Sequence, residues 1–400
     1  MSAEANVLAV PSNRMRSGLF ALVLYCVGHF FIDMYSGAMG AFQPILLQKL
    51  HFSLAEAGIL GGIIVFSGSF VQPVYGYLSD RFHSRMFSVL APAVAGIFIS
   101  CLGFAPNFQI AAMLIFIGGA GIASFHPQAS ARATLGIESN RGRWMAVYIS
   151  AGSLGLAAGP SFFTSIAQGL GIGRSWLAAF PGILVTVVMF ICMRGPDRPE
   201  PHAYQSFDLA PLKAVKGPLT LLALLVLLRS GIQIVFGQFL PLYLIRERGF
   251  ELTTAAYALS MFQVAGALGG FAGGHLTDRF GGRQVILWST IGSIPLLAMF
   301  FFTHGLTSMI GLWVGGLVLL CTVPVNVLMG QELAPKAAGT VSALMMGFAW
   351  GLGGLIFVPA IGALSDRLTM QTTMSSMIVF PAIGIFLALK LPRHLHRGTA

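Results

Sequence analysis

Long runs of apolar residues, interrupted by short polar stretches, dominate the chain from residue 18 to residue 391. Each run covers roughly 20 residues, the length that an α-helix needs to cross the hydrocarbon core of a bilayer. The ten-residue alternation of a membrane β-barrel is absent from the sequence. The pattern therefore predicts an all-α membrane protein with twelve transmembrane helices, at residues 18–44, 54–78, 86–105, 109–131, 144–166, 175–194, 217–245, 253–276, 284–303, 308–331, 338–363 and 373–391.

One long hydrophilic stretch, RGPDRPEPHAYQSFDLAPLKAVKG at residues 194–217, divides the predicted helices into two sets of six. Its proline and charge content is typical of a linker. We therefore predict an N-terminal six-helix bundle over residues 1–194, a cytoplasmic linker over 195–216 and a C-terminal six-helix bundle over 217–400. The first helix is too long for a signal-peptide core and no cleavage pattern follows it, so we expect it to be retained.

The two halves repeat a charged turn. GYLSDRFHSR at residues 76–85 and GHLTDRFGGR at residues 274–283 are identical at six of ten positions and lie 198 residues apart. The first and seventh predicted helices also match, in FQPILL (42–47) and FLPLYL (239–244). Six helices repeated in parallel predict two bundles related by an axis along the membrane normal, as in transporters with a binding site between the halves.

Each charged turn is a candidate conformational latch. A glycine lets another helix approach closely, an aspartate can face the positive end of a helix dipole, and arginines can pair with carboxylates or last-turn carbonyls. Two basic turns that only obey membrane topology are the alternative. Their occurrence at matching points favours a latch of Gly76, Asp80, Arg81, Arg85, Gly274, Asp278, Arg279 and Arg283. A partial copy, GALSDR at residues 362–367, suggests no mechanism from the sequence alone.

Composition and charge support a membrane protein and argue against nucleic-acid binding. Charged residues make up 9 % of the chain and mean hydropathy is +0.81, whereas a soluble domain carries about 25 % charged residues. With a cytoplasmic N-terminus, 17 of the 23 Lys and Arg residues fall on the cytoplasmic side of the twelve helices. That asymmetry follows the positive-inside rule, so we expect a bacterial inner-membrane protein with both termini cytoplasmic.

The sequence carries no signature of an enzyme or a metal site. Its four cysteines are single thiols inside apolar runs, without CxxC spacing. Neither a Walker motif nor a Ser/His/Asp arrangement is evident, which disfavours a primary pump and a membrane hydrolase. We expect no enzymatic activity, no cofactor and no metal. The expected partners are a small-molecule substrate, protons and membrane lipids, and we expect a monomer.

The two charged turns resemble the signature that the major facilitator superfamily carries after its second and eighth helices, and the resemblance covers essentially the whole chain. HFFIDM (29–34), FHPQAS (125–130) and the segment 331–354 further resemble the fosmidomycin resistance protein group of bacterial exporters. This resemblance implies efflux, and it implies that the first, fourth, seventh and tenth helices line the substrate cavity.

Two features temper the resemblance to exporters. An acidic residue usually follows FHP in the exporter group, whereas this chain has Gln128. GLAAGP at residues 155–160 partly matches a glycine-proline pattern of exporters in the fifth helix, but small residues also serve tight helix packing.

Four ionisable residues lie well inside the predicted helices, where a charge costs about 2.5–3.5 kcal/mol. They are His29, Asp33, His126 and Arg229. His29 and Asp33 are four residues apart and share one helix face. Arg229 matches Ile32 through the repeat, which predicts a depth close to that of Asp33. We predict that Asp33 and His29 carry the coupled proton, and that Arg229 and His126 bind an anionic substrate.

Amides on the same helices are further candidates for substrate binding. Gln128 corresponds to Asn326 at an offset of 198 residues, and Gln233 lies one turn beyond Arg229. The alternative for each amide is hydrogen bonding between helices. For Asp33 and Arg229 the alternative is a structural ion pair.

Together these patterns predict proton-coupled efflux of small organic, mainly anionic, compounds by alternating access. In this hypothesis the substrate anion displaces Asp33 from Arg229, and Asp33 then takes up a proton. Two alternatives stay open: a proton-linked importer of an organic anion, with the opposite coupling, and a receptor that binds its ligand without transporting it.

Overall fold

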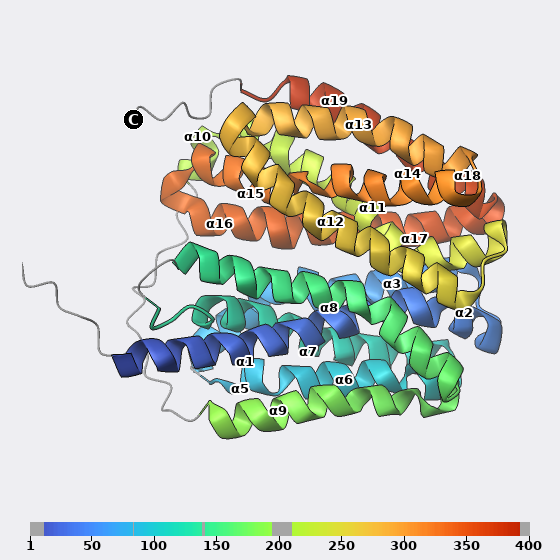
Figure 1. Cartoon of the computed structure of the whole chain (residues 1–400), viewed down its shortest axis with the longest axis horizontal. Helices are drawn as coiled ribbons and strands as arrows, with labels where there is room; N and C mark the ends of the chain where they lie inside the picture. Colours follow the sequence, from blue (N-terminus) through green and yellow to red (C-terminus); the bar gives the residue numbers. More distant parts are fainter. Residues whose placement is uncertain (1–11, 83, 138–140, 194–209, 393–400) are drawn as a thin grey trace, which may run out of the picture.

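The structure is a computed structural model that describes residues 12–82, 84–137, 141–193 and 210–392. Twelve helical segments of this part of the chain are long and apolar enough to cross a membrane, which confirms the predicted all-α membrane fold. They run side by side along the long axis (Figure 1). We call the end where the first helix begins the linker end, and the opposite end the distal end.

The six spans of the N-terminal half include several that are built from consecutive helices. They are α1 (Ser12–Ser36) with α2 (Met39–Leu50); α3 (Leu54–Val65), the π-helix η1 (Phe66–Phe70) and α4 (Gln72–Phe82); α5 (Met86–Val89), α6 (Ala91–Ser100) and η2 (Cys101–Phe104); α7 (Phe108–Arg132); α8 (Arg141–Gly169); and η3 (Ile172–Ala179) with α9 (Phe180–Cys192). The first span therefore continues beyond its predicted end at residue 44, because a second helix follows the break after Ser36.

The C-terminal half begins with a short helix and repeats the six-span pattern. Its elements are α10 (Ala210–Ala214), α11 (Lys216–Arg248), α12 (Leu252–Phe280), α13 (Gly282–Phe302), α14 (Gly305–Leu320) with α15 (Thr322–Leu333), η4 (Pro335–Ala337), α16 (Ala338–Ser342), the π-helix η5 (Ala343–Ala349) with α17 (Trp350–Arg367), α18 (Met370–Ser375), η6 (Ser376–Ile378) and α19 (Val379–Leu389). Most of the predicted linker lies outside the described residues, and its described part holds α10.

Glycines allow matching helices of the two halves to pack equally closely. A Cβ atom on Gly155 of α8 would collide with the backbone carbonyl of Phe30 in α1. A Cβ atom on Gly353 of α17 would lie 2.7 Å from the carbonyl of Leu227 in α11. At each of these two contacts only a glycine lets the helices approach this closely. Gly155 therefore has the packing role that was the alternative to an exporter motif.

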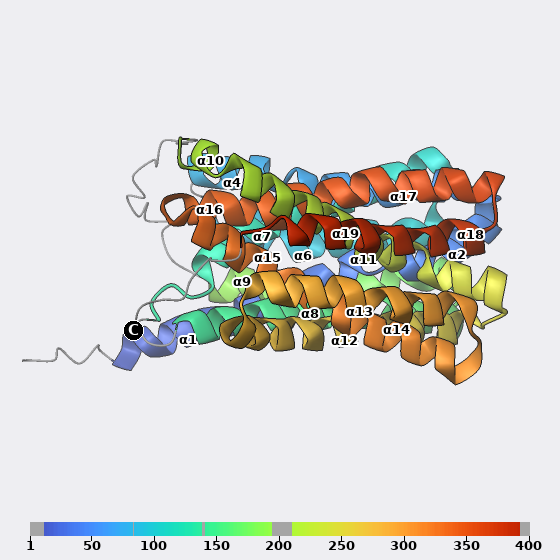
Figure 2. The same cartoon turned by 90° about the horizontal axis from the view of Figure 1, so that it is seen from above.

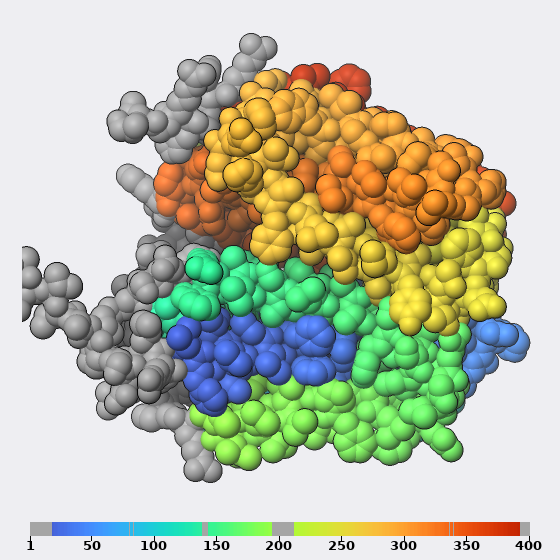
Figure 3. Space-filling model, in the orientation of Figure 1, coloured from blue at the N-terminus to red at the C-terminus, as the bar shows by residue number. Residues whose placement is uncertain are grey.

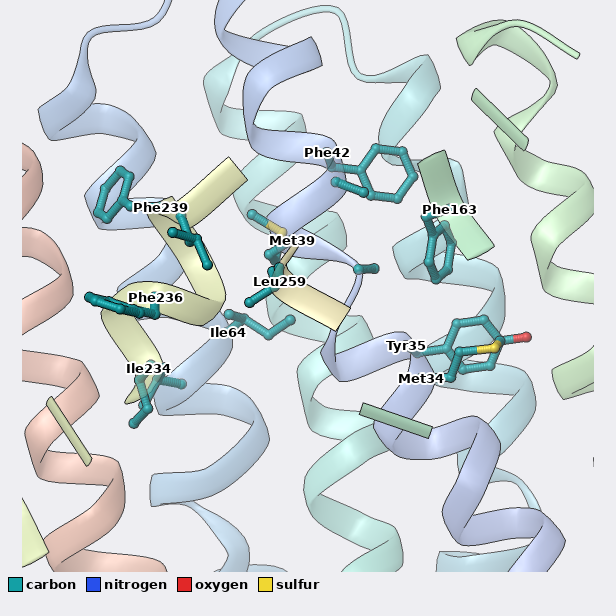
Figure 4. Packing of buried hydrophobic residues seen from close by; sticks show 14 of the residues in the cluster. Met34, Tyr35, Met39, Phe42, Ile64, Phe163, Ile234, Phe236, Phe239 and Leu259 are labelled. Carbon is teal, nitrogen blue, oxygen red and sulfur yellow. The ribbon is translucent and has the colours of Figure 1, made fainter. Parts of the chain in front are cut away.

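The two halves of the chain meet along α8 and α12 on the face seen in Figure 3. On the opposite side of the molecule, α3 packs against α17. Buried apolar side chains from both halves, including Met39 and Leu259, form one continuous cluster (Figure 4). A Cβ atom on Gly40 would lie 2.8 Å from the carbonyl of Gly237 across this contact, so α2 and α11 touch backbone to backbone.

Candidate functional site

Three ionisable side chains meet inside the N-terminal half. Asp33 of α1 places Oδ2 3.3 Å from Nε2 of His29, one turn earlier on the same helix. Its Oδ1 lies 3.4 Å from Nε2 of His126 on α7. The side chains of Asp33 and His126 are 20 % and 22 % exposed, so the cluster is partly accessible. The structure thus brings together three residues that the sequence analysis singled out.

Hydrogen bonding fixes the proton content of this cluster. Nδ1 of His29 lies 2.8 Å from the backbone carbonyl of Tyr148, and because a carbonyl only accepts, Nδ1 must carry a hydrogen. A neutral His29 would then turn a bare Nε2 towards the Asp33 carboxylate, so two acceptors would face each other. One proton between Nε2 and Oδ2 resolves this conflict. The ligand atoms of the three residues lie within 4.8 Å of one another, close enough to hold one small cation.

A close approach of α8 completes the cluster. A Cβ atom on Gly152 would meet both the His29 ring and the Asp33 carboxylate, at 2.5 Å from Oδ2. The Tyr148 ring stacks on the His29 ring with centroids 4.3 Å apart. The sequence analysis missed Tyr148 and Gly152, because neither residue is ionised in the usual pH range and the search for a site rested on ionisable residues and amides. Their spacing of four residues places them on one face of α8.

Arg229 lies apart from this cluster, inside the C-terminal half. Its Nη1 donates a hydrogen bond of 2.6 Å to Oε1 of Gln233. It lines a cavity of about 20 Å³ between α11, α13, the α14–α15 span and α19, and Asn326 lines the same cavity. Among the described residues, no carboxylate forms an ion pair with Arg229.

Helix geometry explains why Arg229 does not face Asp33. Gln238 accepts a hydrogen bond of 3.3 Å from Nε2 of Gln43, so its face of α11 points towards the N-terminal half. Nine residues separate Arg229 from Gln238, and at 100° per residue this places Arg229 about 180° away. The predicted exchange of Arg229 between Asp33 and an organic anion does not fit this arrangement. A cavity of about 20 Å³ holds one molecule of the size of water, so the cavity that Arg229 and Asn326 line is too small for an organic substrate in this structure.

Gln128 also differs from its prediction as a substrate contact. Its Oε1 accepts hydrogen bonds from Ser88, one from the backbone N of 3.1 Å and one from the hydroxyl of 2.5 Å. Its Nε2 donates to the hydroxyl of Ser79 and to the carbonyl of Ser84, at 2.7 and 2.8 Å. All its hydrogen-bonding capacity is used. Gln128 therefore ties the first charged turn to α7, which is the interhelical alternative.

We expect Gln128→Leu to destabilise the protein without changing ligand affinity. The substitution leaves the polar groups of Ser79, Ser84 and Ser88 without their partner, a loss of about 2–4 kcal/mol. Thermal unfolding in detergent measures it, with Gln72→Leu as a control that removes a hydrogen bond to the Gly68 carbonyl. Unchanged stability, or a loss of ligand binding in the folded variant, would return Gln128 to the substrate site.

The predicted latch residues make contacts within their own halves. Gly76 faces Pro127 of α7, and Arg283 donates to the carbonyl of Leu389 at the end of α19, at 2.8 Å. Gly274 was predicted as a point of close approach, but the space beside it is open and Gly273 contacts the backbone of Cys321 instead. The predicted close approach lies one residue earlier, because Gly273 and not Gly274 faces the backbone at Cys321.

The other charged-turn residues likewise keep local partners. Arg81 donates to the Tyr77 hydroxyl at 3.3 Å, and the Arg85 guanidinium lies over the Phe190 ring. Arg279 lies over the Phe280 ring, and Asp278 is exposed. The side chain of Asp80 lies outside the described residues. The contacts described here lie within each half, and the role of these residues as a latch stays a prediction.

The distal end is closed by a contact from the partial third copy of the turn. Asp366, near the end of α17, accepts hydrogen bonds from the backbone N–H groups of Leu54 and Ala55, at 2.9 and 2.8 Å. These groups begin α3, where the helix dipole attracts an anion. Thr253 of α12 also donates to Gln168 of α8 at this end. The residues GALSDR thus join the two halves, a function that the sequence analysis did not find.

Twelve spans in two repeated halves, sealed at one end and carrying an ionisable cluster within the bundle, define a membrane transport protein. A family model described as Major Facilitator Superfamily matches residues 25–358. The chain therefore belongs to the major facilitator superfamily, whose members are transporters and not enzymes, as the sequence resemblance predicted.

Similar proteins agree with this assignment. The chain is 30 % identical to the uncharacterized MFS-type transporter YfnC of Bacillus subtilis (strain 168), over 93 % of this chain and 92 % of the relative. It is 25 % identical to the fosmidomycin resistance protein of Escherichia coli (strain K12), over 97 % of each chain. The fold matches the crystal structure of a bacterial homolog of the human lysosomal transporter Spinster, with a TM-score of 0.78, 15 % identity, and coverage of 95 % and 97 %.

Proposed function

We propose that this transporter exports small organic anions across the bacterial inner membrane in exchange for protons. The observation that carries the proposal is the cluster of His29, Asp33 and His126, in which both carboxylate oxygens of a partly exposed Asp33 lie within 3.4 Å of a histidine nitrogen. An ionisable cluster inside a bundle is costly and needs a function. One charge moved across 100 mV supplies about 2.3 kcal/mol, so one coupled proton can drive substrate against a gradient.

The two partners of Asp33 couple the anion to the proton. Nε2 of His126 can donate to Oδ1 of Asp33 or to an anion that arrives beside it. When a substrate carboxylate or phosphonate takes His126, Asp33 loses a hydrogen-bond donor, which favours uptake of a proton by the cluster. Anion and proton then bind together, so exchange requires that this proton be released again before the loaded protein opens to the other side. In the scheme suggested by the sequence, the anion and Asp33 compete for Arg229. Here they compete for His126 instead.

The closed distal end is the state in which an exporter would take up its substrate from the linker end. Asp366 and the α2–α11 contact seal this end, so substrate would enter from the linker end. We assign the linker end to the cytoplasm, because the excess of Lys and Arg belongs there by the positive-inside rule. A groove between α10, α11 and η5 offers about 420 Å³ near the linker end, with Lys213 and Lys216 among mainly apolar residues. Its basic residues suit an anion with an apolar body.

The relatives support a small organic substrate. One relative is named for resistance to fosmidomycin, and it aligns over nearly the whole chain. Fosmidomycin is therefore the first compound to test. The importer alternative uses the same cluster with protons and substrate moving together, and the receptor alternative predicts binding without flux.

Topology is testable without a substrate. Cysteines introduced at Ser206 and Thr399 in a Cys-less background should react with an impermeant reagent only from the cytoplasm. One at Phe250, between α11 and α12, should react only from outside. Both outcomes follow from twelve spans with cytoplasmic termini. Labelling of position 206 from outside would reverse the assignment of the linker end and remove the argument for export.

A further inference from the structure

We propose that the C-terminal half binds one small inorganic anion, of the size of chloride, between Arg229 and Asn326. The anion would be a resident partner of the buried guanidinium and not the transported organic compound. This inference does not rest on the proposed function, because it concerns a cavity that lies away from the His29, Asp33 and His126 cluster.

The charge of Arg229 is buried without a counter-charge. The residue is 8 % exposed, and its Nη1 donates a hydrogen bond to the neutral amide of Gln233. Arginine stays protonated in proteins, and a buried charge without a partner costs several kcal/mol. Among the described residues, no carboxylate pairs with Arg229, and both oxygens of Asp33, which the sequence offered as its partner, face histidines. A bound anion would therefore stabilise the buried charge of Arg229.

Two buried polar atoms of the residues that line the cavity have no hydrogen-bond partner within the described part of the chain. Nε of Arg229 and Oδ1 of Asn326 are both unpaired and buried, and Asn326 is 1 % exposed. Both residues line the same cavity. Buried polar groups are nearly always hydrogen-bonded, so two orphans at one cavity indicate a missing guest. An asparagine amide can turn its NH2 group to the site, which would give an anion two donors.

The size of the cavity limits which ligand can bind in it. Its volume of about 20 Å³ exceeds the roughly 10–15 Å³ that one water needs, and leaves no room for a second group. An organic anion does not fit. A single water would satisfy the hydrogen bonds but not the charge, so a monatomic anion fits both requirements. The rest of the lining is apolar or consists of hydroxyl groups that already donate, such as Ser289 to the Val318 carbonyl.

The test is anion-dependent stability of the purified full-length protein in detergent. Sodium chloride and sodium gluconate are compared at equal ionic strength, because gluconate is too large for the cavity. Chloride at about ten times its Kd should raise the Tm by about 2 °C, and the effect should saturate. Arg229→Met should lose this response, whereas Arg246→Gln, an exposed charge on the same helix, should keep it. In gluconate the Arg229→Met protein should be at least as stable as the wild type, since it buries no unpaired charge.

Direct binding keeps the proposal falsifiable if Arg229→Met does not fold. Radioactive chloride should bind the wild-type protein with a stoichiometry near one, displaced by bromide but not by gluconate. Asn326→Leu should weaken this binding while the protein stays folded. Absence of saturable chloride binding to the wild type would overturn the proposal and leave a water in the cavity. Undiminished binding in a folded Arg229→Met variant would overturn it equally.

Discussion

Asp33→Asn should abolish proton-driven transport while the protein still binds its anionic substrate. Asparagine keeps the size of the side chain but neither takes up nor releases a proton, so it mimics the protonated cluster. The variant should bind the anion at least as tightly as the wild type and exchange substrate for substrate. Proton-driven uptake into proteoliposomes should fall at least about a hundredfold, a loss of the whole coupling and not of one hydrogen bond. Glu251→Gln, an exposed carboxylate at the distal end, is the matched control and should transport normally.

The same variant should lose the pH dependence of binding. If one proton is taken up with each anion, wild-type affinity falls by up to about tenfold per pH unit above the range where the cluster loses its proton. In Asp33→Asn that slope should flatten, leaving only the weaker contribution of His126. Calorimetry between about pH 5.5 and 8.5, in two buffers that differ in ionisation enthalpy, measures affinity and proton uptake together. An unchanged slope would leave Asp33 as a structural partner of the two histidines.

Asp366→Ala should open the distal end. The carboxylate accepts two backbone hydrogen bonds at the start of α3, and capping together with the dipole term contributes about 1–2 kcal/mol. Losing it should change the ratio of closed to open distal ends by about five- to thirtyfold. Spin labels at the exposed positions Leu170 and Glu251, one on each half, report the change as a longer distance in pulsed EPR.

A conservative variant separates the cap from general damage. Asp366→Asn retains a side-chain acceptor but loses the charge, so its shift should be smaller than that of Asp366→Ala. Gly362, one turn earlier, approaches the backbone of Leu54 and Gly58, and apolar packing there should keep both variants folded. If the label distances in Asp366→Ala matched the wild type, the carboxylate would not be the contact that holds this end closed.

The twelve spans could be predicted from the sequence because each of them is a nearly continuous apolar run. It also placed His29 beside Asp33, since the two lie four residues apart on one helix, but it grouped His126 with Arg229 and not with this pair. Arg229 shows where this reasoning stops. The repeat aligned it with Ile32, which predicts its depth along the helix but says nothing of the face on which it lies. Ile32 is fully buried in its own half, and Arg229, at the matching position of α11, is buried as well. The position that matches Asp33 is the next residue of α11, so it faces about 100° away from Arg229.

Contacts between distant segments could not be predicted from one sequence. Gln128 was weighed as a ligand or as a link between helices, and only the positions of Ser79, Ser84 and Ser88 decide between them. Asp366 carried a signal in its SDR motif, but its position at a helix end gave no hint of the partner helix. That partner, α3, begins more than 300 residues earlier in the chain, and packing of the two halves brings it close.

The central claim is that organic anions and protons move in opposite directions through this protein. Proteoliposomes containing the purified wild-type protein, with an acidic lumen and fosmidomycin outside, test it directly. We predict that fosmidomycin accumulates in the lumen, that a lumenal dye reports alkalinisation when it is added, and that Asp33→Asn shows neither. Accumulation driven by an acidic exterior would identify a symporter, and fosmidomycin binding without any flux would identify a receptor; either result would contradict the account.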